Sequence, residues 1–178
     1  GTTGSSGSSG TSGSSGKDGD FGGITFNYDF EIDNTSNADP GAGNIKFNAS
    51  IASGQNTATV LFVDDSDKNS TDIQSTLRTI DDSTSTLKGH VKVSKRYDAT
   101  KFVLYTISAS TEYSGWFGIT VSPVDSSAAS PFAVDDELLL TFARTGDAGD
   151  AGTSGTTGSS GSSGTSGSSG TAGSTGTS

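Results

Sequence analysis

The middle of the chain begins with a strict alternation of apolar and polar residues. From Ile24 to Ile32 every even position is apolar and every odd position is polar, which is the pattern of a strand with one buried face. Strands of this kind at short spacing favour an antiparallel β-sandwich, such as a jelly roll, over a parallel α/β sheet. Apolar runs between turn residues predict further strands at Ile45–Phe47, Ala58–Val63, Gly89–Ser94, Phe102–Ser108, Gly115–Pro123 and Glu137–Arg144.

One segment departs from the β pattern and predicts a short helix. Between Thr71 and Ile80, the apolar residues Ile73, Leu77 and Ile80 recur at the spacing of one helical face. Ser70 or Thr71 is the candidate N-cap, and acidic residues fall in the first turn. We expect this helix to cover one end of the β core.

Glycine takes every third position on both sides of the β segment. A strict Gly-X-Y period is what a collagen triple helix requires, because only glycine fits at its crowded axis. The alternative is a flexible Gly/Ser linker, which has no reason to keep register. The triplets contain no proline, so we expect them to need outside help to assemble. The glycines predicted at the axis are Gly1, Gly4, Gly7, Gly10, Gly13, Gly16, Gly19, Gly146, Gly149, Gly152, Gly155, Gly158, Gly161, Gly164, Gly167, Gly170, Gly173 and Gly176.

The chain therefore divides into a stalk at 1–21, a β bead at 22–145 and a second stalk at 146–178. We expect the bead to form a homotrimer, because trimerisation would raise the effective concentration of the three stalk strands. Interchain ion pairs at the junctions would add about 0–1 kcal/mol each and help to set register. The charged junction residues are Lys17, Asp18, Asp20, Asp147 and Asp150.

The string GTTGSSGSSGTSGSSG occurs both at 1–16 and at 155–170, which indicates a modular fibre with further copies along its length. The chain starts at Gly1 with neither an initiator methionine nor a signal-peptide pattern. We therefore expect it to be a segment of a longer protein. The Ser and Thr hydroxyls of the triplets are candidate O-glycan acceptors.

Composition excludes several classes of function. The chain has no cysteine and no apolar run of transmembrane length, which excludes disulfide scaffolds, thiol chemistry and membrane insertion. Its formal net charge is −10, which argues against nucleic acid as a partner. No cofactor motif is present, so we expect no cofactor.

The chain contains weak candidates for catalytic and metal-binding residues. The single histidine, His90, alternates with Val91 and Val93, which predicts a solvent-facing imidazole rather than a member of a catalytic triad. Asp65, Asp67 and Asn69 have the opening spacing of a calcium loop. Ser70 and Thr76 then replace the glycine and glutamate that an EF-hand requires. We expect no metal site of that class and no catalytic residue, and hence no enzymatic activity.

An aromatic pair offers the remaining candidate for recognition. Trp116 follows Gly115 at a predicted hairpin tip, near Tyr113. An exposed indole there could stack on a cell-surface glycan or receptor, while packing within the core or between subunits is the alternative. Trp116 and Tyr113 are therefore the candidate glycan contacts.

Three strings of the bead carry a family resemblance: GDFGGITF at 19–26, TIDDSTSTLKGH at 79–90 and LTFARTGD at 140–147. Taken together they resemble a domain that recurs between collagen-like repeats in virion fibre proteins of marine bacteriophages. The resemblance spans about 125 residues and implies a trimeric tail or capsid fibre component, located on the virion or outside the cell. The stalks lack the charged triplets that such proteins carry. A secreted bacterial collagen-like filament or adhesin is the alternative function, and a glycan-degrading spike is the third.

Overall fold

The computed structural model describes residues 23–31 and 33–149. The axis glycines from Gly1 to Gly19 and from Gly152 to Gly176 lie outside these residues, as do Lys17, Asp18, Asp20 and Asp150.

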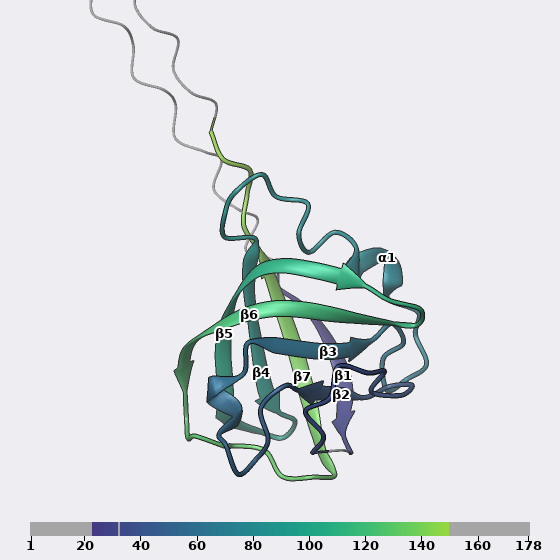
Figure 1. The fold of residues 1–178 in the computed structure, drawn as a ribbon, viewed down its shortest axis with the longest axis vertical. Coiled ribbons are helices and arrows are strands. Elements are labelled where there is room, and N and C mark those ends of the chain that lie inside the picture. Colours follow the sequence, from purple (N-terminus) through teal and green to yellow (C-terminus); the bar gives the residue numbers. More distant parts are fainter. Residues whose placement is uncertain (1–22, 32, 150–178) are drawn as a thin grey trace, which may run out of the picture. The chain divides into compact units, whose positions relative to one another are not determined.

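Seven strands and two short helical turns follow one another along the described chain (Figure 1). Their bounds are β1 Ile24–Phe30, β2 Ile45–Phe47, the 3-10 turn η1 Gln55–Thr57, β3 Val60–Asp64, α1 Gln74–Leu77, β4 Gly89–Lys95, β5 Asp98–Glu112, β6 Trp116–Ser126 and β7 Asp136–Arg144. All seven strands were predicted from the sequence, and the all-β, antiparallel fold with one short α-helix is confirmed.

The strands form one antiparallel sheet in the order β1-β7-β4-β5-β6-β3-β2. The sheet curls until its two edge strands approach each other. There the Asp29 amide of β1 donates to the Gly43 carbonyl over 3.0 Å, and Asp29 and Asn44 form an isolated bridge. The sheet is thus nearly closed around one core, and the inward alternate residues of every strand fill it. The largest fully buried side chains are Tyr28, Phe30, Phe47, Tyr105, Phe117 and Phe132.

Two strands are longer than the sequence predicts. β5 and β6 pair along most of their length, with the register shifting between Leu104 and Tyr105 and again between Ile107 and Ala109. Each shift is a β-bulge, which bends a long strand without ending it. Pro123 stands beside the first bulge, and this is where a proline is tolerated in a strand.

The predicted helix over 71–80 is wrong in length and in its N-cap. α1 covers only Gln74–Leu77, and its N-cap position is Ile73, which makes no side-chain cap. Ser70 has a positive φ of 61°, and the Thr71 carbonyl accepts from the Asp67 amide, so both residues belong to the preceding turn. The predicted apolar face is nevertheless correct, since Ile73, Leu77 and Ile80 are all buried.

Candidate functional site

The first and last strands place both chain connections of the bead at one end. Ile24, at the start of β1, is the register partner of Phe142, near the end of β7 (Figure 1). Gly23 fits tightly here, because a Cβ on it would lie 2.7 Å from Thr141 Cγ2. We call this end, where β1 begins and β7 finishes, the connection pole.

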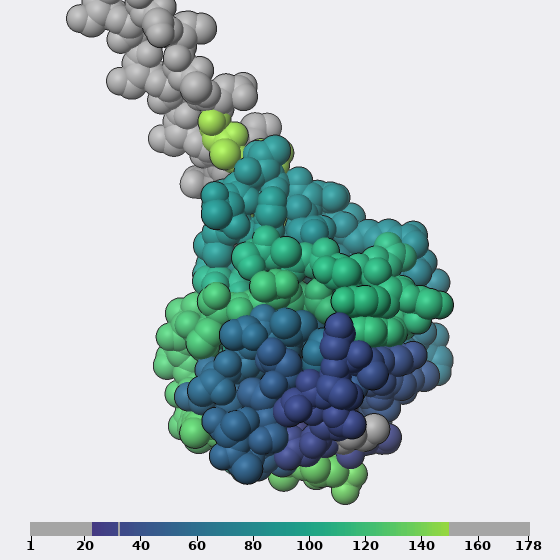
Figure 2. Space-filling model, viewed as in Figure 1, coloured from purple at the N-terminus to yellow at the C-terminus, as the bar shows by residue number. Residues whose placement is uncertain are grey.

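A loop holds the outgoing chain at the connection pole. Ser83 Oγ donates to the Gly146 carbonyl over 2.9 Å, and the Thr84 amide donates to Asp147 Oδ1 over 3.0 Å. The Ala148 amide in turn donates to Thr84 Oγ1 over 2.9 Å. Figure 2 shows this teal loop against the yellow-green outgoing segment. No local pattern indicates that Ser83 and Thr84 hold the junction, because their partners lie more than 60 residues away in the chain.

Asp147, a predicted junction ion-pair residue, accepts a hydrogen bond within its own chain. Its side chain is exposed, and Oδ1 accepts a hydrogen bond from within the same chain. Gly146 and Gly149, the two predicted axis glycines within the described residues, follow directly on the strand β7.

The indole of Trp116, a candidate glycan contact, is buried instead of exposed. Trp116 is only 8% exposed, and it stacks on Tyr113 with ring centroids 4.0 Å apart and packs edge-on against Phe62 at 5.8 Å. These residues lie on the face of β3 and β6 opposite the main core, where Gly118 leaves room for the Tyr113 ring. The indole packs inside the chain, as the alternative interpretation held, and Tyr113 is the partly exposed member at 38%.

A buried lysine completes this aromatic cluster of Phe62, Tyr113 and Trp116. Lys46 is 3% exposed, and its Nζ lies 5.4 Å from the centroid of the Phe62 ring. Burial lowers the pKa of Lys46, and the nearby Asp39 opposes this effect. The ammonium therefore rests on an aromatic face, a cation–π contact that holds the charge in an apolar setting.

The predicted metal-loop residues are used for structure. Asp67 Oδ1 accepts from the amides of Asn69 and Thr71, both over 2.9 Å. The side chain of Lys68 lies between the two candidate ligands in sequence and reaches away to Asp29 and Glu137. Among residues 23–31 and 33–149, no cluster of three acidic or histidine side chains could hold a metal ion.

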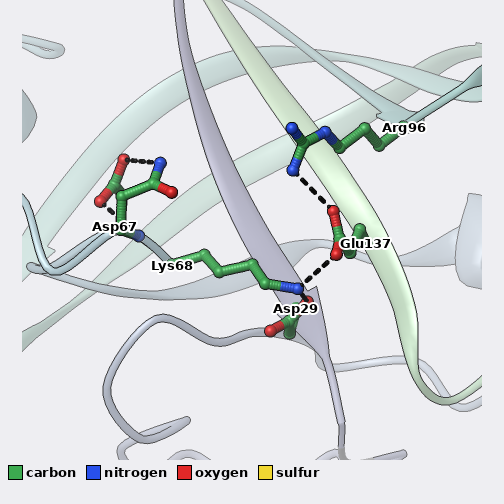
Figure 3. A network of polar contacts seen from close by, with 6 residues as sticks. Asp29, Asp67, Lys68, Arg96 and Glu137 are labelled. Carbon is green, nitrogen blue, oxygen red and sulfur yellow. Dashed lines mark hydrogen bonds and ion pairs between the residues drawn. The ribbon is translucent and has the colours of Figure 1, made fainter.

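Lys68 joins two carboxylates that oppose each other across strands. Asp29 on β1 and Glu137 on β7 are register partners, and Lys68 Nζ lies 2.6 Å from an oxygen of each (Figure 3). Arg96 Nη1 contacts the other oxygen of Glu137 at 2.7 Å. Hydrogen bonds from Lys68 and then Arg96 lower the pKa of Glu137. This network fastens the loop at 65–70 to the β1–β7 pair.

Other titratable side chains lie on β4 and β7. His90 is half-buried on β4, on the face opposite the fully buried Val91 and Val93. Asp136 pairs with Lys95, and Glu137 pairs with Lys68 and Arg96. These carboxylates hold loops in place.

Comparison of the chain with protein-family models, with curated proteins and with solved structures finds no match. None of the helices in the described residues is long and apolar enough to span a membrane.

Proposed function

We propose that this chain is a structural component of a homotrimeric fibre, on a virion or outside a cell, in which the bead acts as a spacer and as a displayed surface. The observation that carries the proposal is the pair of Gly-X-Y blocks, which keep their period of three on both sides of the β bead. A triple helix needs three strands, so its partners are further copies of this chain. Catalysis has no part in the proposal.

The connection pole determines where the two flanks join the bead. Because β1 starts beside the end of β7, both flanks attach to the bead at the same pole. The two attachment points therefore lie side by side in the β1–β7 pair.

A cell-surface glycan remains the proposed partner of the displayed surface. Within the aromatic cluster, Tyr113 offers a ring that is 38% exposed and backed by Trp116. Aromatic faces stack on sugar rings, and a weak single contact gains strength when three copies act together. Adhesion of the intact trimer to host-cell glycans, compared with Tyr113→Ala, tests this part separately.

Sedimentation of the full chain tests the assembly. We expect a trimer at micromolar concentration, and a monomer would overturn the proposal. Gly149→Ala should open the C-terminal stalk to proteases while the bead stays folded, because a methyl group at the axis clashes in all three strands. Ser154→Ala, a change away from the axis, is the matched control. If both variants resist proteolysis equally, the triplets are not a triple helix.

A further inference from the structure

The bead contains three Asn-X-Ser/Thr sequences in which the middle residue is not proline. They are Asn34-Thr35-Ser36, Asn48-Ala49-Ser50 and Asn69-Ser70-Thr71. This sequon is the acceptor sequence for N-linked sugar, which is attached to the side-chain nitrogen of the asparagine in surface segments. The structure distinguishes the three asparagines by their exposure and by the contacts of their carboxamide groups.

Asn48 connects the end of β2 to the start of β3. Its Oδ1 accepts from the backbone amides of Thr59 over 2.8 Å and of Val60 over 3.0 Å. Its Nδ2 donates to Thr59 Oγ1 over 2.8 Å, and the side chain is half-buried. A sugar on this nitrogen would push the side chain away from Thr59 and break these contacts, so we expect Asn48 to stay unmodified in the folded bead.

Asn69 is exposed, but its side-chain nitrogen faces a carboxylate. Nδ2 donates to Asp67 Oδ2 over 3.3 Å, and the backbone amide of Asn69 donates to Asp67 Oδ1 over 2.9 Å. Asp67 is itself only 7% exposed. The turn at 67–72 therefore holds the Asn69 nitrogen toward the bead, where a transferase would first have to separate it from Asp67.

Asn34 has a different arrangement. It lies near the start of the segment 33–39, in which every residue is exposed. Its Oδ1 accepts from the backbone amide of Ser36 over 2.8 Å, which forms an Asx turn. This contact uses the oxygen of the carboxamide and not its nitrogen. The same turn brings Ser36, which carries the hydroxyl of the sequon, back beside the asparagine.

We propose that Asn34 is an acceptor site for N-linked oligosaccharide in the folded bead, and that Asn48 and Asn69 are not. In the transfer, Asn34 Nδ2 bonds to the anomeric carbon of a sugar carried on a polyprenyl diphosphate, and the bond from that carbon to the diphosphate oxygen breaks. One proton leaves the nitrogen for a base of the transferase, and the polyprenyl diphosphate departs with the electron pair of the broken bond. The attached glycan is bulky and hydrated, and it would cover the exposed segment at 33–39.

The modification goes beyond the proposed fibre function, because it concerns a single bead and does not depend on trimerisation. It rests on one part of that function, the location outside a cell, since the sequon marks surface loops of secreted proteins.

Sugar transfer to the folded full chain in vitro tests the proposal. The chain is produced without sugar in a bacterial cytosol and incubated with a polyprenyl-diphosphate oligosaccharide and a purified oligosaccharyltransferase that requires only the sequon. We expect the intact mass to rise by one oligosaccharide, and peptide mapping to place it on Asn34. Synthetic peptides with the sequences of 31–39, 45–53 and 66–74 serve as unfolded controls, and all of them should be modified.

Point variants assign the added mass to one sequon. Ser36→Ala removes the hydroxyl but keeps the backbone amide that closes the Asx turn, so this variant should fold normally and lose the modification. Ser36→Thr keeps a hydroxyl and should be modified. Ser50→Ala and Thr71→Ala break the other two sequons, and both should gain the same mass as the wild type.

Two results contradict the proposal. If the peptide 31–39 accepts the sugar and the folded chain does not, Asn34 is not an acceptor site of the bead. If the folded chain gains sugar at Asn48 or Asn69 as fast as at Asn34, the contacts of the carboxamide groups do not select the site. Sedimentation of the same sample reports the trimer separately, so a failed transfer and a failed fibre proposal are distinguishable.

Discussion

At the scale of single residues, one lysine offsets the repulsion between two carboxylates that face each other on neighbouring strands. Like charges directly opposite each other in neighbouring strands destabilise a sheet, and Asp29 and Glu137 occupy such positions. Lys68 comes from a loop outside the pair and binds both carboxylates, while Arg96 binds Glu137 as well. Sequence spacing placed Lys68 inside a calcium-like loop, and nothing local indicated partners that lie 39 and 69 residues away.

Replacing Lys68 should lower the thermal stability of the bead more than replacing a lysine that forms no ion pair among the described residues. Lys68→Met leaves the two carboxylates facing each other, and we expect the thermal midpoint to fall by a few degrees. Lys101→Met is the control, because Lys101 is exposed and forms no ion pair within the described residues. Calorimetry at low and at high salt measures the difference, which should shrink as salt screens the repulsion. A Lys68→Met midpoint equal to that of the control contradicts the bridging role.

The same network predicts a dependence on pH. Hydrogen bonds from Lys68 and Arg96 lower the pKa of Glu137 in the folded bead below its ordinary value of 4.5. A carboxyl with a lowered folded pKa contributes stability that is complete above its unfolded pKa and is lost as the pH falls through the folded pKa. The stability difference between wild type and Lys68→Met should therefore be full at neutral pH and shrink progressively as the pH falls below 4.5. A difference that stays constant down to pH 2 would exclude Glu137 as its source.

Trp116 shows how a local pattern can place a residue in a hairpin correctly and still leave its packing unpredicted. The Gly115-Trp116 pair does lie at a hairpin tip, where Gly115 has a φ of 87°. What could not be predicted is that Phe62 and Tyr113 would enclose the indole on the outer face of the sheet. That arrangement depends on the β3–β6 register, which is a long-range property.

Trp116→Ala is therefore expected to act on stability. Truncating a buried tryptophan costs about 3–5 kcal/mol, and we expect a loss near the lower end because the cluster lies at the surface. Tyr113→Ala should cost less, since the ring is already partly exposed. Urea unfolding followed by far-ultraviolet circular dichroism compares the two variants. A Trp116→Ala bead as stable as the wild type would contradict the packing seen here.

At the scale of elements, the strands could be predicted because each buries one face. A strand with one buried face alternates apolar and polar residues, and this alternation is visible in the local sequence. α1 is shorter than the helix that its apolar spacing predicts. The reason is that residues 67–72 form a turn, so the residues expected in the first helical turn are not helical. Its apolar spacing survives because Ile73, Leu77 and Ile80 are buried by the strands beneath. Helical spacing therefore predicted the buried face correctly and overestimated the number of helical hydrogen bonds.

A buried glutamine holds two loops together, and sequence analysis missed it. Gln55 of η1 is fully buried; its Nε2 donates to the Phe132 carbonyl over 3.1 Å, and its Oε1 accepts from the Phe132 amide over 3.0 Å. The Gln55 carbonyl also accepts from the Tyr105 hydroxyl over 2.6 Å. A side-chain amide can satisfy the carbonyl and the amide of one residue, and here it connects η1 to the segment that leads into β7.

Gln55→Leu keeps the side-chain volume but removes both of these side-chain hydrogen bonds. The amide and carbonyl of Phe132 then stay buried without partners, and each unsatisfied group costs about 1–3 kcal/mol. We expect a loss of about 2–4 kcal/mol in unfolding free energy, measured by urea denaturation. Gln74→Leu, at the chain's other glutamine, removes a surface contact to Glu112 and should have a much smaller effect. Similar losses in the two variants would contradict the connecting role of Gln55.

At the scale of the whole bead, the pairing of the first strand with the last determines where the flanks attach. Alternation in β1 and β7 predicted that both are strands, but alternation does not identify a strand's neighbour. Pairing of residues more than 100 positions apart requires the complete sheet order. For that reason the order of stalk, bead and stalk along the chain does not reveal that both flanks join the bead at one connection pole.

A pair of engineered cysteines should confirm the connection pole in solution. Thr25 and Thr141 are register partners at this pole, and their hydroxyls share a hydrogen bond of 2.9 Å. The chain has no cysteine of its own, so Thr25→Cys/Thr141→Cys should form one intrachain disulfide without competition. Closing a loop of this length stabilises a folded domain by at most about 5 kcal/mol, so the oxidised bead should melt above its reduced form. Thr25→Cys/Thr120→Cys is the control, because Thr120 lies on β6, which pairs with β3 and β5 and not with β1. If the control closes as readily as the test pair, or if the test pair links only different chains, the flanks do not attach to the bead at one pole.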